Sequence, residues 1–343
     1  MRLLMSASRQ SGRLTESYAR ALTRLGCEVI PHYGAAETRL VAHAGADKII
    51  NRTAPALKRR GSNNRLLAQA RKHRPDLIWL FKGMDIQPRT LRQLREDGHK
   101  IACLNADHPF EHYARGAGNR SVADAVALYD VYLTYSARIA GEIKARHARL
   151  RTEILPFGHE LDDAGFANIA GMKEVQRACF VGTPDAARVR TLRALSGAGV
   201  PVDVYGHGWA RHWRALGGAR IFPAAEGEDL YPVLRAYRVQ LNLFRPHNVG
   251  AHNMRSFEVP AAGGVMLAPA SPEHERFFED GGEAIYFSGE RDMIGKAKAL
   301  LAKGVWEIQR LRNRARRRSA VSGYHYRDRA RAALAILSDV AAG

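Results

Sequence analysis

Arg255 and Glu258 are charged residues on an otherwise apolar segment, residues 254–262, whose apolar positions recur as on one face of a helix. Gly263 and Gly264 follow, and glycine can end a helix because it adopts positive φ at little cost. An arginine in the first turn opposes the helix dipole, so its presence there indicates an anion to be bound. A glutamate carboxylate can accept hydrogen bonds from two adjacent hydroxyl groups.

An apolar strand is expected directly after the glycine pair, at residues 265–268, and Pro269 ends it. Loop, helix, glycine pair and strand make up half of a βαβ unit. In such a unit the N-terminus of the helix lies beside the carboxyl edge of a parallel sheet, where free backbone N–H groups bind anions. The segment therefore predicts an anion site at a sheet edge.

Further phosphate-binding candidates follow two other expected strands. Gly182 would let the backbone approach a phosphate closely, Thr183 can donate a hydrogen bond, and an Arg188 guanidinium matches phosphate oxygens. Gly206 and His207 follow the strand expected at 202–205 and are candidates to wall a base or a phosphate. An exposed helix arginine at 188 and an ordinary turn at 206–208 are the alternatives.

Asp107 and His108 stand at the carboxyl end of the strand expected at residues 100–105. A carboxylate or an imidazole there can take the proton of an acceptor hydroxyl. Alternatively, His108 caps its loop and Pro109 fixes the turn. The sequence has no H-E-x-x-H motif and no D-x-D pair, so we predict no metal site.

The composition is that of a globular protein. A chain of 343 residues, 46% hydrophobic and 25% charged, can form two domains of ordinary size. It has no apolar run of about 18 residues, so no membrane-spanning helix is expected, and its first residues indicate a strand rather than a signal peptide. Three widely spaced cysteines suggest a reducing compartment, so we expect a cytoplasmic protein.

The net charge of +19 is abnormal and predicts attraction to an anionic partner, either nucleic acid, a lipid-linked acceptor or an acidic membrane face. Residues 298–331 form a basic run that contains Arg310, Arg312, Arg314, Arg316, Arg317 and Arg318. A solvated helix face in an arginine-rich chain is the alternative explanation for this run.

Strands and helices alternate along the whole chain, which predicts an α/β protein with parallel sheets. Strands are expected near residues 3–6, 27–30, 77–81, 100–105, 131–134, 152–155, 179–183, 202–205, 239–243 and 265–268. Helices are expected near residues 18–25, 62–73, 88–96, 185–196, 229–237, 254–262, 296–302 and 306–320, with a last helix that ends at residue 340. Residues 162–175 are weakly patterned and suit a linker.

The sequence R-S-F-E-V-P-A-A-G-G at 255–264, the apolar strand, and E-R-F-F-E-D-G-G-E-A-I-Y-F at 275–287 together resemble a known family. They are similar to the donor-binding half of CgeB-like (spore-maturation-type) glycosyltransferases, which are relatives of the GT-B glycosyltransferases. The resemblance implies two Rossmann-like domains with an interdomain cleft. It places an acceptor domain at residues 1–160, a nucleotide-sugar domain at 175–325, and a terminal helix at 326–343 that crosses back to the first domain.

The resemblance also implies an activity. The protein would be a hexosyl- or related glycosyltransferase that needs no metal and no tightly bound cofactor. Glu258 would hold the ribose of a nucleotide-sugar, while Arg255, Gly182, Thr183 and Arg188 would hold its diphosphate. Many retaining relatives have a second glutamate eight residues earlier, where this chain has Gly250, so the stereochemical outcome stays open.

The acceptor is not fixed by the resemblance. A glycan, a lipid-linked molecule and a nucleic acid all remain candidates, with peripheral binding to an anionic membrane as an option. The alternative functions are a GT-B nucleotide-sugar epimerase, which would use water and no acceptor, and a nucleic-acid-binding or nucleic-acid-modifying protein on the same fold.

Overall fold

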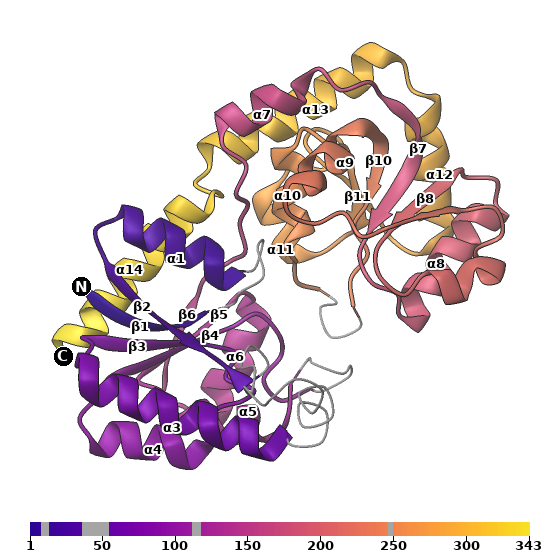
Figure 1. The fold of residues 1–343 in the computed structure, drawn as a ribbon. Helices are drawn as coiled ribbons and strands as arrows, with labels where there is room; N and C mark the ends of the chain where they lie inside the picture. Colours follow the sequence, from indigo (N-terminus) through magenta and orange to yellow (C-terminus); the bar gives the residue numbers. More distant parts are fainter. Residues whose placement is uncertain (8–13, 36–54, 112–117, 246–249) are drawn as a thin grey trace, which may run out of the picture. The chain divides into compact units, whose positions relative to one another are not determined.

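Two six-stranded parallel sheets, each flanked by helices, dominate the computed structural model of the chain (Figure 1). The structure describes residues 1–7, 14–35, 55–111, 118–245 and 250–343. They divide into an N-terminal unit, made of Met1–Pro156 and Arg327–Gly343, and a C-terminal unit, Phe157–Tyr326. The predicted α/β class with two Rossmann-like sheets is confirmed.

The sheet of the N-terminal unit has the strand order β2-β1-β3-β4-β5-β6, and every neighbouring pair is parallel. Its strands are β1 (Arg2–Ala7), β2 (Glu28–Tyr33), β3 (Leu77–Phe81), β4 (Ile101–Asn105), β5 (Val131–Thr134) and β6 (Arg151–Ile154). Its helices are α1 (Leu14–Arg24), α3 (Pro55–His73), α4 (Pro88–Glu96), α5 (Arg120–Ala125), α6 (Ala137–Arg146) and α14 (Tyr326–Ala342), with a short 3₁₀ turn at Val126–Leu128.

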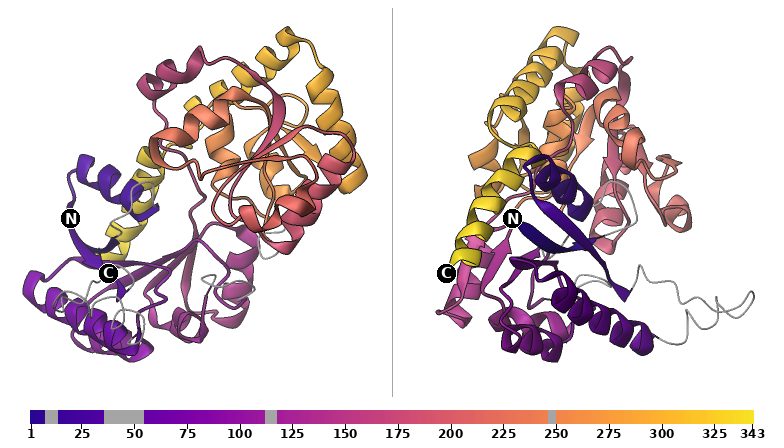
Figure 2. Two further views of the ribbon diagram at one scale, coloured as in Figure 1. Left: turned by 45° about the vertical axis from the view of Figure 1, so that its right-hand side comes forward. Right: turned by 60° about the vertical axis from the view of Figure 1, so that its left-hand side comes forward.

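Helices cover both faces of this sheet, with α1 and α14 on one side and α3 and α4 on the other (Figures 1 and 2). The central strands therefore consist of continuous apolar residues without alternation, as expected for a parallel sheet buried on both faces. In β3, residues 77–80 are wholly buried. The polar ends of the strands, by contrast, reach the carboxyl edge of the sheet.

The sheet of the C-terminal unit has the order β12-β11-β10-β7-β8-β9. Its strands are β7 (Val175–Val181), β8 (Val202–Tyr205), β9 (Arg220–Phe222), β10 (Tyr237–Leu241), β11 (Met266–Pro269) and β12 (Ile285–Phe287). Its helices are α7 (Asp163–Ala170), α8 (Ala186–Gly197), α9 (Leu230–Ala236), α10 (Arg255–Ala261), α11 (Pro272–Phe277), α12 (Glu290–Ala302) and α13 (Val305–Val321). This is a doubly wound order: all strands are parallel, and the direction in which successive strands are added along the sheet reverses between β7 and β10. Ligands bind at such a topological switch point.

The weakly patterned segment at residues 162–175 differs from the expected linker, because it contains α7. The side chain of Asp162 accepts a hydrogen bond from the Gly165 backbone N–H at 2.8 Å and so caps the helix. The Arg316 guanidinium lies 4.6 Å from the centre of the Phe166 ring, and Ile169 is buried. The sequence hid this helix because long-range packing rather than its own periodicity stabilises it.

The basic run at residues 298–331 is not one solvated face. Arg312 and Arg316 are buried, and they pair with Glu174 at 3.0 Å and with Asp163 at 2.5 Å. Arg314 binds Glu279, and Arg318 donates to the carbonyl of residue 277. Much of this positive charge therefore holds α13 to the rest of its unit.

The residues that the structure describes contain neither a membrane-spanning helix nor a metal-binding cluster. No helix among them is both long and apolar enough to cross a bilayer. The same part of the chain has no cluster of three or more His, Cys, Asp or Glu side chains that could hold a metal ion. The expected loop at residues 8–12 and most of the loop before His252 lie outside the described residues.

Candidate functional site

The strongest candidate site lies at the carboxyl edge of the C-terminal unit's sheet, where the loops after β7, β8 and β9 meet the first turn of α10. A small cavity of about 60 Å³ opens there. It is lined by Val181, Gly182, Thr183, Tyr205, Gly206, His207, Ala224, Ala225, Glu226 and Arg255. The structure thus brings five residues singled out by sequence, at positions 182, 183, 206, 207 and 255, to one hollow.

The glycines of this hollow allow two loops to approach each other closely. Gly206 has φ of 151°, and a Cβ atom there would lie 2.1 Å from the carbonyl oxygen of Gly182. That same oxygen accepts a hydrogen bond from Trp209 Nε1 at 2.6 Å. Any other residue at 206 would push the loops apart, so this glycine sets the shape of the cavity.

Three arginines gather around the Gly182–Thr183 loop. Arg188 Nη1 donates to the Thr183 carbonyl at 3.0 Å, and Arg245 Nη2 donates to Thr183 Oγ1 at 3.1 Å. The pKa of Arg188 is lowered to about 10, first by burial and then by the charges of Arg245 and Arg255, against the opposing effect of Asp185. Mutual repulsion among three cations favours an anion between them.

Arg255 is the arginine whose hydrogen bonding is incomplete. Its Nη1 pairs with Oε2 of Glu258, one turn further along α10, and the Glu258 side chain is almost wholly buried. Its Nε is buried and has no hydrogen-bond partner among the described residues. A buried N–H without a partner is costly, and a ligand oxygen at this point would satisfy it.

A buried polar network holds the start of α10 in place. Asn253 Oδ1 accepts from the Ser256 backbone N–H at 3.1 Å, and Asn242 Nδ2 donates to Ser256 Oγ at 3.1 Å. Ser256 Oγ lies 2.7 Å from Nε2 of His274, and Nδ1 of that ring lies 3.0 Å from the Pro269 carbonyl. The imidazole therefore donates from Nδ1 and accepts at Nε2, which is the neutral form. Burial lowers the pKa of His274 to about 4, in keeping with that form.

Gly263 and Gly264 support α10 and line neither of the two cavities. Gly263 has φ of 64°, the left-handed conformation that ends the helix. A Cβ atom on Gly264 would lie 2.6 Å from the Leu234 carbonyl oxygen, so only glycine allows α9 and α10 to pack this closely. The structure places the pair behind the site, where it fixes the helix that carries Arg255 and Glu258.

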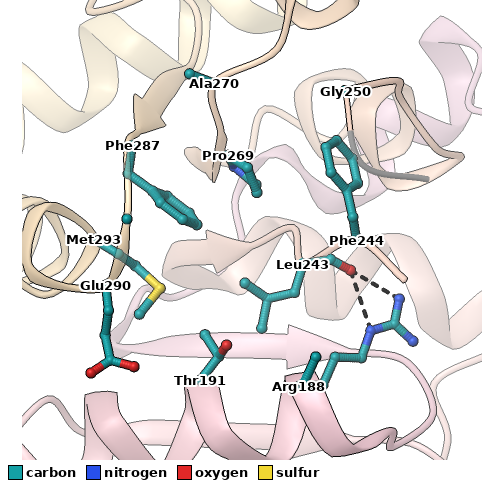
Figure 3. A pocket seen from close by; sticks show the side chains of 12 residues that line it. Arg188, Thr191, Leu243, Phe244, Gly250, Pro269, Ala270, Phe287, Glu290 and Met293 are labelled. Carbon is teal, nitrogen blue, oxygen red and sulfur yellow. Dashed lines mark hydrogen bonds between the residues drawn. The ribbon is translucent and has the colours of Figure 1, made fainter. Parts of the chain in front are cut away.

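Arg188 lines a second cavity of about 250 Å³ between α8, α12 and the ends of β10, β11 and β12 (Figure 3). Figure 3 shows its guanidinium turned to the Leu243 carbonyl, which it meets at 2.9 Å through Nη2. Gly250 lines the same cavity, and a Cβ atom at this position would meet nothing within 4 Å. The φ of 81° at Gly250, however, is a left-handed backbone conformation that favours glycine, so a side chain there would be strained despite the open space.

The N-terminal unit carries a different set of groups at the carboxyl edge of its own sheet. Lys82 Nζ lies 2.5 Å from Oδ2 of Asp107, and both side chains are partly exposed. The His108 side chain is wholly buried, and its Nε2 lies 3.0 Å from Glu142 while its Nδ1 accepts from the Phe110 backbone N–H at 3.2 Å. Burial lowers the pKa of His108, against the opposing charges of Glu111 and Glu142. Both ring nitrogens are thus engaged, whereas the Asp107 carboxylate reaches the surface.

Sequence reasoning missed two residues of these sites, Arg245 and Lys82. Arg245 lies four residues after the end of β10 and precedes a proline, so its position in the loop after a strand was a usable signal. Lys82 has φ of 60°, in the left-handed region that few non-glycine residues adopt. Such strain is common at functional positions, but it becomes visible only in three dimensions.

Comparisons with known proteins bear on the fold and on the sequence of the C-terminal unit. The model of a family described as glycosyl transferase-like matches residues 187–335. A sucrose-phosphate synthase from Thermosynechococcus elongatus has a similar structure, with a TM-score of 0.70 at 14% identity over 99% of both chains. The Anabaena protein HepE in complex with UDP gives 0.65 at 10% identity over 98% of this chain and 99% of the other. No curated protein sequence matches the chain.

A third solved structure, described as a UDP-N-acetylglucosamine 2-epimerase from Listeria monocytogenes, has a TM-score of 0.60 at 11% identity. It covers 98% of this chain and 96% of the other. The fold is therefore GT-B, as predicted. The C-terminal unit in addition resembles glycosyltransferases in sequence, and it is this unit that contains the hollow lined by Arg255.

Proposed function

We propose that the protein is a CgeB-like glycosyltransferase of the hexosyl or a related type, and that its donor is a nucleotide-sugar bound at the hollow that Arg255 lines. The observation that carries this proposal is the group formed by Arg188, Arg245 and Arg255 around the Gly182–Thr183 loop, in which the Arg255 Nε has no hydrogen-bond partner among the described residues. HepE has been crystallised with UDP, so UDP-sugars are the first donors to test.

The cationic cluster would stabilise the diphosphate of the donor as it leaves. When the bond between the sugar's anomeric carbon and the diphosphate oxygen breaks, negative charge develops on the departing nucleoside diphosphate. Guanidinium groups fixed in advance stabilise that charge without reorganising during the reaction. Arg255 would act on the leaving phosphate, and the Gly182–Thr183 loop would bring backbone and hydroxyl groups next to it.

Glu258 would bind the ribose of the donor. An ionised carboxylate can accept from two neighbouring hydroxyls, and this one is buried and paired with Arg255, which lines the hollow. The pair on one turn of α10 would therefore hold the ribose with one member and the adjacent phosphate with the other.

Asp107 is the residue of the N-terminal unit that best fits proton transfer from the acceptor. Its carboxylate is 23% exposed, whereas the two ring nitrogens of His108 are engaged inside the unit. In this proposal the acceptor oxygen forms its bond to the anomeric carbon while its proton passes to Asp107. The acceptor would be a glycan, a lipid-linked molecule or a nucleic acid met in the cytoplasm.

Metal independence is part of the proposal, because three arginines already surround the place assigned to the diphosphate. EDTA should leave the turnover of a UDP-sugar unchanged, and added manganese or magnesium should not raise it. The measurement is the initial rate of nucleoside diphosphate release in each condition. Loss of turnover in EDTA, restored by either ion, would show that the arginines do not suffice.

The ribose assignment is tested with Glu258→Gln in titrations against uridine, guanosine and other nucleoside diphosphates. We expect nucleotide affinity to fall by about 1–3 kcal/mol, the scale of hydrogen bonds to a charged group. Glu275→Gln is the matched control, because Glu275 is exposed on α11, away from the hollow, and its loss should change nothing. Equal affinities of wild type and Glu258→Gln for all nucleotides would contradict the assignment.

A nucleotide-sugar epimerase is the second candidate, favoured by the similarity to the Listeria structure. Product analysis separates the two functions. A transferase releases nucleoside diphosphate in proportion to a glycosylated acceptor, whereas an epimerase converts one nucleotide-sugar into its epimer without any acceptor.

A further inference from the structure

The outward face of α13 carries one aromatic side chain, one aliphatic side chain and two arginines in a single stripe. The stripe consists of Trp306, Arg310, Arg317 and Val321. The last three follow Trp306 by four, eleven and fifteen positions, which places all four on the same side of a helix with 3.6 residues per turn. The opposite side is buried in the C-terminal unit through Ile308, Leu311, Arg312, Ala315, Arg316 and Ser319. Figure 1 shows α13 at the margin of that unit, beside α7.

The apolar members of the stripe are among the most exposed in the described part of the chain. Trp306 is 87% exposed and Val321 75%, and Val305 at the start of the same helix is 69% exposed. Over the 17 residues of α13, Trp306 and Val321 stand at the two ends of the helix with the arginines between them, so the stripe combines exposed apolar and basic groups along its length.

The two arginines of the stripe differ from the other arginines of α13. No hydrogen bond or ion pair joins Arg310 or Arg317 to any residue that the structure describes, whereas Arg312, Arg314 and Arg316 are all paired. Glu307, the acidic residue one turn before Arg310, is itself bound by Lys303 at 2.7 Å. The stripe therefore presents positive charge that no described carboxylate bonds directly, although Arg310 lies within electrostatic range of Glu307.

We propose that this stripe docks the protein on an anionic lipid surface, with Trp306 and Val321 at the headgroup boundary and the arginines on lipid phosphates. Tryptophan favours that boundary because its ring is amphipathic, and basic side chains are attracted by anionic headgroups. A net charge of +19 adds long-range attraction of the same sign. Nucleic acid fits less well, because exposed valines gain nothing from phosphates and stack poorly on bases.

The test compares binding of the full chain to phosphatidylcholine vesicles with binding to vesicles in which part of that lipid is replaced by phosphatidylglycerol. The wild type should sediment with the anionic vesicles only, and added salt should release it. The double variant Arg310→Gln/Arg317→Gln should bind them roughly 30-fold more weakly, given about 1 kcal/mol for each basic residue at such a surface. Trp306→Ser should also weaken binding.

Matched controls come from the same unit. Arg190 and Arg193 are exposed on α8, so Arg190→Gln/Arg193→Gln removes the same charge elsewhere, and Trp213→Ser removes the other exposed tryptophan. Both controls should bind like the wild type, and the fluorescence of Trp306, measured in a Trp213→Phe background, should shift to the blue on binding. The proposal would be overturned if the control variants weakened vesicle binding as much as the stripe variants do. It would also be overturned if the protein bound duplex or single-stranded nucleic acid and did not bind vesicles.

Discussion

The carboxyl edges of the two sheets share an architecture and differ in how far their charges are satisfied. At the edge of the N-terminal unit, Lys82 is paired with Asp107, and His108 is bonded to Glu142. At the edge of the C-terminal unit, three arginines share few carboxylates, and one of them has a buried N–H without a partner among the described residues. The second edge thus presents a cluster of positive charge, whereas at the first edge the charged groups have partners within the unit.

The network that holds the start of α10 in place is consistent with this contrast in charge. The start of α10 rests on a network of buried neutral groups, Asn242, Asn253, Ser256 and His274, which fixes its position without adding charge. A cation in that network would repel Arg255 and its neighbours. Neutral polar groups therefore support α10 without adding a charge beside Arg255, which lines the hollow together with Glu226.

The largest effect is expected at the edge of the N-terminal unit. Asp107→Asn should lower the turnover of a UDP-sugar by roughly 100-fold or more, the scale of general base catalysis, and leave nucleotide affinity unchanged. Steady-state rates and equilibrium titrations measure the two quantities separately. Asp97→Asn, which removes a surface carboxylate paired with Arg71, should change neither.

His108→Asn sharpens the same prediction, because the buried ring is bonded at both nitrogens. This variant should lose about 1–3 kcal/mol of unfolding free energy and retain nucleotide binding. Wild-type turnover in Asp107→Asn would contradict the role of Asp107 and would leave the acceptor proton to the departing diphosphate.

A smaller effect is expected in acid, on the stability that His274 contributes beneath the carboxyl edge of the C-terminal unit's sheet. Unfolded His274 titrates near 6.5, whereas burial lowers its folded pKa to about 4, so between these values the unfolded state binds more protons. Stability must therefore fall as pH drops from 6.5 toward 4, by about 3 kcal/mol from this residue.

Urea unfolding at pH 7 and near pH 4 measures that loss. In His274→Phe the part of the acid destabilisation that belongs to this residue should disappear, although the variant starts from lower stability because Ser256 loses its partner. His207→Asn, which changes an exposed histidine, should keep the wild-type pH dependence. An unchanged pH dependence in His274→Phe would show that the ring is not held neutral.

Much of the fold could be predicted from the sequence, because strands buried on both faces are continuous apolar runs that stand out between polar segments. The helix at residues 88–96 was predicted with its observed bounds, since Pro88 starts it and its apolar positions are regular. The strand predicted at 239–243 begins two residues earlier in the structure, at Tyr237, because the chain leaves α9 directly into β10. Helix α7 escaped notice because its stabilising partners lie far away in sequence.

The site was predictable where a residue follows a strand and not where its role depends on a distant neighbour. Positions 182, 183, 206, 207 and 255 follow strands or begin a helix, and they line one cavity. No local pattern could show that Arg312 and Arg316, within the basic run, are buried partners of Glu174 and Asp163. The pairing of charges is a property of the tertiary structure.

The most direct test of the account is the affinity of Arg255→Gln for UDP and for uridine, measured by isothermal titration calorimetry beside the wild type and Arg190→Gln. Glutamine can still donate to Glu258, so the change removes mainly the charge that we assign to the diphosphate. Affinity for UDP should fall by about 1.5–3 kcal/mol, with the weak binding of uridine unchanged and Arg190→Gln like the wild type. Equal affinity of Arg255→Gln and wild type for UDP, or no binding of any nucleoside diphosphate by the wild type, would contradict the central claim.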